Sequence, residues 1–161
     1  MPHRPLLLLL PFAAAVLAAC TPGEKTTPAD AAVAVQVSDA LCRPTPPGRR
    51  MTGCYLTLTA PADDRLAAVT SPVAGRVEIH ESRIESNMMM MHQLEGGVPL
   101  TAGEAVELKP GGVHIMLLAL DGPLEVGDTA PLTLTFASAP PVEVTATVGQ
   151  PATTDYGSAA Q

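Results

Sequence analysis

Four side chains that can bind a soft metal ion lie within 37 residues of each other in this sequence. They follow the pattern His-x10-Met-x22-His-x-Met and are His80, Met91, His114 and Met116. Imidazole nitrogen and thioether sulfur together suit copper, and sulfur in particular selects the monovalent ion. Each residue alone could equally be an ordinary core or surface residue. Because the window holds three of the 4 histidines and most of the 7 methionines, we favour a Cu(I) site.

The elements around these residues could bring them together. His114 and Met116 are two residues apart on an expected strand, so they point to the same face, and they directly follow a Lys-Pro-Gly-Gly turn at 109–112. His80 ends an expected strand, and Met91 lies in the next one, across an expected loop at about 81–87. We therefore expect two strand ends and one strand start to converge on one rim of the domain.

The body of the chain alternates between apolar and polar residues. This period of two is typical of half-buried strands, and turn signals separate the segments. The 17 prolines disfavour long helices. An all-β, antiparallel sandwich or barrel is therefore expected. The expected strands are 32–38, 54–59, 65–70, 74–80, 88–94, 104–108, 114–120, 132–136 and 142–148.

The N-terminal residues predict export. Residues 1–19 form a short apolar signal that ends Leu-Ala-Ala before Cys20, which resembles a bacterial lipobox. We therefore expect cleavage before Cys20 and acylation of that cysteine. The alternative is an ordinary secretory signal with an incidental cysteine. We expect residues 20–31 to form a flexible tether, 32–148 the copper-binding domain, and 149–161 a disordered tail.

The net charge and the cysteines restrict which functions the protein could have. The net charge of −7 argues against nucleic-acid binding. The chain has no Trp and few other aromatic residues, so the core must be aliphatic. Outside the cytoplasm, Cys42 and Cys54 are expected to form a disulfide. The alternative is a copper site that uses both thiolates.

Several segments together resemble the periplasmic PCu(A)C-type copper chaperones, over roughly residues 34 to 140. The resemblance implies a cupredoxin-like Greek-key β-sandwich and one Cu(I) held by the two histidines and two methionines above. It also implies delivery of copper toward the dinuclear copper centre of cytochrome c oxidase. The segments that carry it are 43–48, 55–58, 64–66, 74–81, 89–91, 94–97, 106–112 and 114–117.

The sequence departs from that family at several places. Leu41 stands where an aromatic residue is expected, and the cysteines at 42 and 54 lie outside the usual pattern. Met89 and His92 are extra metal donors beside Met91, and no His-rich tail follows the domain. A strong Cu(II) site is therefore not expected.

The main expectation is an extracytoplasmic copper chaperone tethered to a membrane. The acceptor would be a membrane-bound copper protein, such as a cytochrome c oxidase subunit or another chaperone. Thr21 rather than Asp follows the lipobox cysteine, which by resemblance to enterobacterial sorting favours the outer membrane. The alternatives are copper sequestration without a dedicated acceptor, a blue-copper electron carrier and a structural lipoprotein without metal. No catalytic motif is found, so an enzyme is not expected.

Overall fold

The computed structural model describes residues 34–151, and these residues form ten β-strands and no helix. No helix in this range is long and apolar enough to cross a membrane. The predicted signal, Cys20, the tether and most of the predicted tail lie outside the described residues. The strands are β1 (Gln36–Cys42), β2 (Met51–Thr59), β3 (Asp64–Thr70), β4 (Ala74–Glu85), β5 (Met88–Gln93), β6 (Val98–Leu100), β7 (Ala105–Leu108), β8 (Val113–Leu120), β9 (Thr129–Phe136) and β10 (Val142–Val148).

Alternation along the strands creates one buried face and one exposed face. In β2, Thr52, Cys54, Leu56 and Leu58 are buried, while the residues between them are partly exposed. β9 follows the same pattern. The buried face is almost wholly aliphatic, and Phe136 is the one aromatic residue in the described core. Burial of these aliphatic side chains is the main source of stability in a fold that has little aromatic surface to bury.

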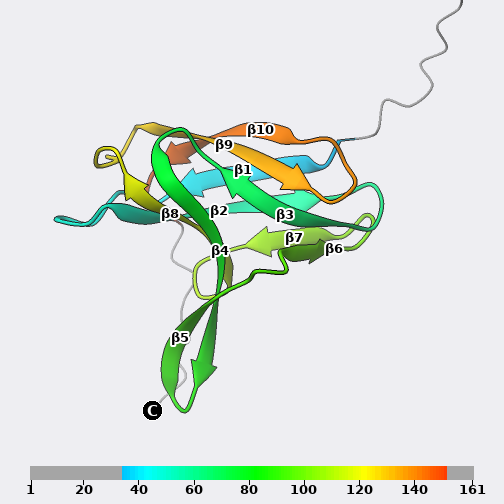
Figure 1. Cartoon of the computed structure of the whole chain (residues 1–161), viewed down its shortest axis with the longest axis horizontal. Coiled ribbons are helices and arrows are strands. Elements are labelled where there is room, and N and C mark those ends of the chain that lie inside the picture. The colour runs from blue at the N-terminus through cyan, green and yellow to red at the C-terminus, as the bar shows by residue number, and fades with distance from the viewer. Residues whose placement is uncertain (1–33, 152–161) are drawn as a thin grey trace, which may run out of the picture.

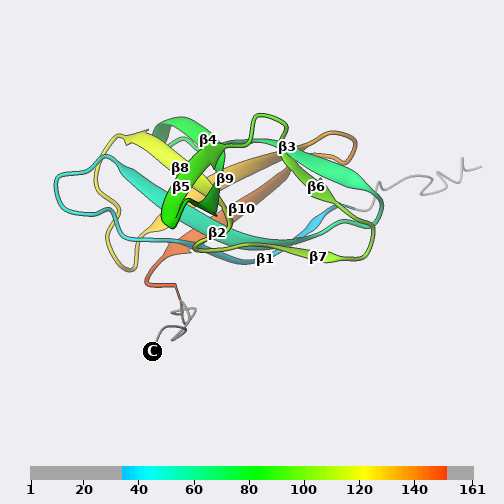
Figure 2. The same cartoon turned by 90° about the horizontal axis from the view of Figure 1, so that it is seen from below.

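The strands pair in the order β5-β4-β8-β2-β1-β10-β9-β3-β6, with β7 on β2. The sheet curls so that its two halves enclose the core (Figures 1 and 2). All pairs are antiparallel except β1 and β10, which run parallel. The expected all-β fold is confirmed, and the sheet is mixed rather than purely antiparallel.

The β4–β5 hairpin differs from the sequence-based expectation. We expected a strand ending at His80 and a loop at about 81–87, but β4 continues to Glu85. The connection is a two-residue turn at Ser86 and Asn87, whose φ values of 51° and 62° match the tight turns that suit hairpins. The hairpin therefore projects well beyond the body of the sheet (Figure 1), and His80 lies in the middle of a strand.

Two other segments also depart from expectation. The first strand begins at Gln36 rather than 32, because its pairing with β2 fixes its position and a bulge interrupts it between Ser38 and Leu41. β6 was not anticipated from the sequence. It follows a turn in which Gly97 has a φ of 71°, and a Cβ there would lie 2.2 Å from the carbonyl oxygen of Leu66, so only glycine fits.

Candidate metal centre

The strand register places all four predicted ligands on one face of the sheet. His80 on β4 lies directly opposite His114 on β8. Met116 is two residues further along β8 and therefore shares this face. Met91 lies opposite Ser82, which is two residues beyond His80 on the same face of β4. The four side chains thus come from three adjacent strands, and we call this surface the front face.

The two imidazoles are close neighbours in an edge-to-face arrangement. Their ring centroids are 6.0 Å apart and the ring planes are inclined by 69°. A ring nitrogen of His80, Nε2, lies 2.8 Å from Oε2 of Glu78. The other nitrogen, Nδ1, is buried and has no hydrogen-bond partner. A carboxylate that holds one nitrogen and leaves the other free is the arrangement found around metal-bound histidines.

His114 is oriented in a similar way by the backbone. Its Nδ1 donates a hydrogen bond to the carbonyl oxygen of Gly112, at 3.0 Å, which leaves Nε2 with a free lone pair. Only 5 % of the residue is exposed. Burial lowers the pKa of His114 below its ordinary value, the hydrogen bond to Gly112 acts against this, and nearby His80 lowers it further. His114 is therefore held as the neutral imidazole, the form that binds metal ions.

An open pocket of about 240 Å³ lies beside the histidines. Three of the predicted ligands, Met91, His114 and Met116, line it, and the His80 ring lies beside the His114 ring, with the centroids 6.0 Å apart. Met91 is 52 % exposed, so it forms the outer lip. The remaining lining residues are Arg43, Pro44, Pro46, Met51, Thr52, Gly53 and Tyr55. The site therefore has an enclosed imidazole side and an open thioether side.

Sequence reasoning missed the wall of this pocket. Gly53 lies opposite Met116 across β2 and β8, and a Cβ there would approach Tyr55 Oη at 3.2 Å and the His114 ring at 3.9 Å. The absence of a side chain at Gly53 thus keeps the pocket open. Met51, two residues away on the same face, adds a third thioether to the lining. These residues come from β2, whose pairing with β8 no local pattern reveals.

The two extra donors lie on opposite faces of the hairpin. Met89 is opposite Ile84 and shares the front face with Met91. His92 is opposite Glu81 and points to the other face, where its Nε2 lies 3.1 Å from Oε1 of Glu85. The structure therefore brings Met89, but not His92, to the side of the predicted ligands.

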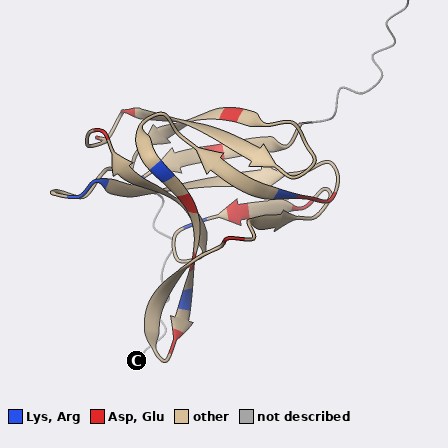
Figure 3. Cartoon of the chain, viewed as in Figure 1, with Lys and Arg blue, Asp and Glu red and all other residues tan. Residues whose placement is uncertain are grey.

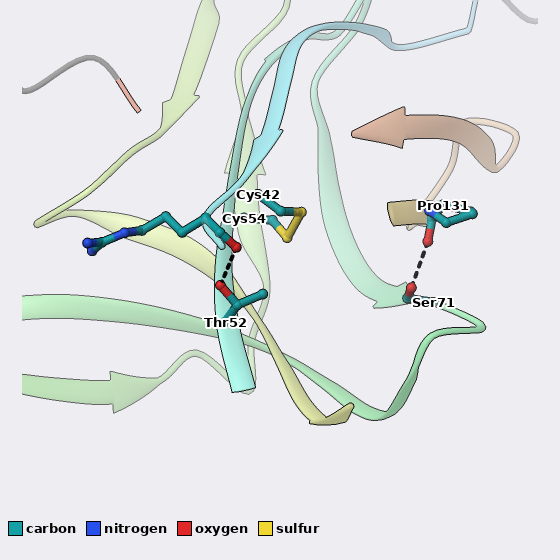
Figure 4. The surroundings of a disulfide bond; sticks show 6 residues. Cys42, Thr52, Cys54, Ser71 and Pro131 are labelled. Carbon is teal, nitrogen blue, oxygen red and sulfur yellow. Dashed lines mark hydrogen bonds between the residues drawn. A yellow bond between two sulfur atoms is a disulfide. The ribbon is translucent and has the colours of Figure 1, made fainter. Parts of the chain in front are cut away.

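The cysteines lie opposite each other on β1 and β2 and are joined by a disulfide with an S–S distance of 1.98 Å. Figure 4 shows this bond, and both cysteines are fully buried in the core. Beside them, Thr52 Oγ1 donates a hydrogen bond of 2.7 Å to the carbonyl oxygen of Arg43. Sulfur atoms bound to each other are not thiolates, so this pair does not offer the ligand that a blue-copper site needs.

The donor types restrict the metal that could bind. Within residues 34–151, no group of three or more His, Cys, Asp or Glu side chains is arranged to hold a metal ion. Zinc sites are normally built from those ligands. A front face with two imidazoles and two thioethers instead suits monovalent copper.

Comparison with known proteins shows the family of this chain. Residues 35–148 match the LpqE-like family, described as "Putative lipoprotein LpqE-like". The chain belongs to the LpqE-like, PCuAC-type family. A relative from Leifsonia xyli subsp. xyli, "Putative lipoprotein Lxx21020", is 33 % identical over 127 residues, which cover 76 % of this chain and 75 % of the relative. The family and relative names fit an extracytoplasmic lipoprotein.

Solved structures of PCuAC domains share the fold. The copper-bound PCuAC domain from PmoF2 superposes with a TM-score of 0.60 at 25 % identity, covering 73 % of this chain and 93 % of that domain. The Cu(I) form of DR1885 from Deinococcus radiodurans gives 0.55 at 27 % identity, covering 73 % and 80 %. The family fold is thus cupredoxin-like, and these neighbours support a copper-chaperone-type domain.

Proposed function

We propose that this protein is an extracytoplasmic copper carrier that binds one Cu(I) on its front face through His80, Met91, His114 and Met116. The observation that carries the proposal is the buried Nδ1 of His80, which has no hydrogen-bond partner. It lies on a ring directly opposite another oriented imidazole. A buried nitrogen without a partner costs free energy unless something binds it, and a metal ion would remove that cost.

The open side of the site suits transfer rather than storage. Two imidazoles and two thioethers are neutral, so bound copper keeps its positive charge. Met91 at the exposed lip and Met116 in the pocket can be exchanged one at a time for ligands of an acceptor. Met89, on the same face, is a spare thioether near the lip. Binding and exchange require no catalysis by the protein.

The proposed destination is a membrane-bound acceptor on the route to the copper centre of cytochrome c oxidase. The proposed lipid on Cys20 holds the carrier at a membrane. A short tether raises the effective concentration of the copper site near membrane proteins without any additional contact. A strain in which Cys20 is replaced by serine should therefore assemble less oxidase when copper is scarce. Unchanged assembly, with copper tolerance lost on deletion of the gene, would favour sequestration.

Two conservative substitutions test the ligand set. Met91→Leu and Met116→Leu keep the apolar volume but remove sulfur, so the fold should survive while the first equivalent of Cu(I) binds more weakly. Met89→Leu is the matched control and should change this affinity less. X-ray absorption at one equivalent should show mixed nitrogen and sulfur neighbours. A shell of nitrogen and oxygen alone, or unchanged binding in both variants, would reject the assignment.

A further inference from the structure

The β4–β5 hairpin exposes an unusual amount of apolar side chain. Of the seven large hydrophobic residues that are exposed in residues 34–151, five belong to it, namely Ile84 and Met88 to Met91. The front-face site accounts for Met91, with Met89 as a spare thioether on the same face, and leaves Ile84, Met88 and Met90 without a role. Exposed apolar side chains that gather on one element usually mark a binding site, so the hairpin needs a second explanation.

Alternation along β5 divides its donors between two faces. Met89 and Met91 lie on the front face, whereas Met88, Met90 and His92 lie together on the other one, which we call the back face. Met88 and Met90 are 62 % and 41 % exposed. Side chains at every second position of a strand are about 7 Å apart at their Cα atoms, and a methionine or histidine side chain can bridge half of that distance.

The side chain of His92 extends over the middle of the back face. Its own neighbour across the hairpin is Glu81, but its Nε2 lies 3.1 Å from Oε1 of Glu85, which is opposite Met88 near the tip. The ring is therefore turned along β5, toward the methionines. Its contact with Glu85 involves Nε2, which leaves Nδ1 for another ligand. The front face shows the same arrangement, in which Glu78 holds Nε2 of His80.

The charges of the back face leave the donors accessible. All charged residues of the hairpin lie on β4 (Figure 3). Arg83, opposite Met90, is ion-paired with Glu81, so its positive charge is balanced within the strand. β5 is the edge of the sheet, and among residues 34–151 no other strand pairs with its free side.

We propose that Met88, Met90 and His92 form a second metal site, which binds monovalent copper on the back face of the hairpin. Two thioethers and one imidazole are a soft, neutral donor set, which favours Cu(I) over zinc. The site is built on exposed side chains, so it binds more weakly than the front face, where one histidine is buried. It does not depend on the front-face assignment, because the two sites share no ligand.

Methionine-methyl NMR of the purified full chain tests the second site directly. With methyl-labelled methionine, Ag(I) serves as a redox-stable probe of Cu(I) sites. The first equivalent should shift the methyl signals of Met91 and Met116, and the second should shift those of Met88 and Met90. Anaerobic titration with Cu(I) against a chromogenic chelator should then count two equivalents.

Substitutions separate the two sites. The double variant Met90→Leu, His92→Ala should lose the second equivalent and keep the first, whereas Met89→Leu, its neighbour on the other face, should keep the second. Met91→Leu with Met116→Leu should weaken the first equivalent and leave the second. A second equivalent that survives the loss of Met90 and His92, or binding that stops at one equivalent in the parent chain, would overturn the back-face site. Neither result would affect the front-face assignment.

Discussion

Replacing Glu78 by glutamine should weaken Cu(I) binding at the front face about 10- to 300-fold. The carboxylate lies 2.8 Å from Nε2 of His80, and its other oxygen lies 2.8 Å from Nε of Arg76. Glutamine has nearly the same shape, so the strand and the ring position should be preserved. The substitution removes the negative charge that makes the imidazole a better donor for copper, and it replaces the acceptor oxygen that faces Arg76 by an amide NH2 group.

The size of this effect follows from the geometry. A metal–nitrogen bond of about 2 Å on Nδ1 would put the copper about 6 to 7 Å from the carboxylate oxygen, across the imidazole ring. Removing a unit charge at that distance costs about 2.5 kcal/mol at an effective dielectric constant of about 20, and about 0.6 kcal/mol in water. The side chain of Glu78 is 15 % exposed, so the true value lies between these limits. A weaker hydrogen bond adds about 1 kcal/mol, and each 1.4 kcal/mol corresponds to about a ten-fold change in affinity.

Competition with a chromogenic Cu(I) chelator would measure the change in affinity for the first equivalent. Glu81→Gln is the matched control, because it removes the same charge from the same strand on the back face, where Glu81 pairs with Arg83. If Glu78→Gln and Glu81→Gln shifted the affinity equally, the charge would act only at long range. The proposed role of Glu78 in orienting His80 would then be wrong.

Four further outcomes are expected. Met51→Leu should slow the release of Cu(I) to a chelator in stopped-flow measurements, because it removes a thioether from the pocket lining. The affinity should change little, since Met51 is not a proposed ligand. Replacing Cys42 and Cys54 by alanine should lower the free energy of unfolding in urea by about 2–4 kcal/mol and spare Cu(I) binding, and the intact mass of the native protein should be two hydrogens below that of the dithiol. Cys20→Ser should release a soluble protein that still binds Cu(I), whereas a variant that stays in the membrane fraction after signal cleavage would reject the lipid anchor. The pKa of His114 is lowered in the folded state, so on acidification the unfolded chain takes up a proton before the folded protein does. The contribution of His114 to the free energy of unfolding should therefore be complete above about pH 6.5 and fall at lower pH. Urea unfolding at several pH values would measure this.

The parts of the candidate site that depend on local sequence patterns could be predicted. His114 and Met116 alternate on a strand that follows a clear turn, so their common face could be stated from spacing alone. The path from His80 to Met91 was harder, because Ser86 and Asn87 form a tight turn without the glycine that usually signals one. The expected loop is therefore a continuous strand pair, and the face of His92 could not be assigned.

Features that depend on pairing between distant segments were beyond sequence reasoning. Gly53 opens the pocket only because β2 lies beside β8. The hydrogen bond between Glu78 and His80 links residues two apart, but a pattern of residues does not show that the other nitrogen of the ring is buried. The fold class was accessible because alternation is repeated along most strands. The parallel pairing of β1 with β10 leaves no such local trace.

The turn at Ser86 and Asn87 has a consequence for metal selectivity. The turn fixes the register in which β5 pairs with β4. A shift of this register by one residue would move every side chain of β5 to the opposite face. Met91 would then leave the front face, and Met90 and His92 would take its place beside His80. A thioether would be replaced by an imidazole, and the front face would change from a donor set that prefers Cu(I) to one that accepts Cu(II) and zinc. At the proposed front-face site, two residues that are not ligands would thus decide which ion is bound.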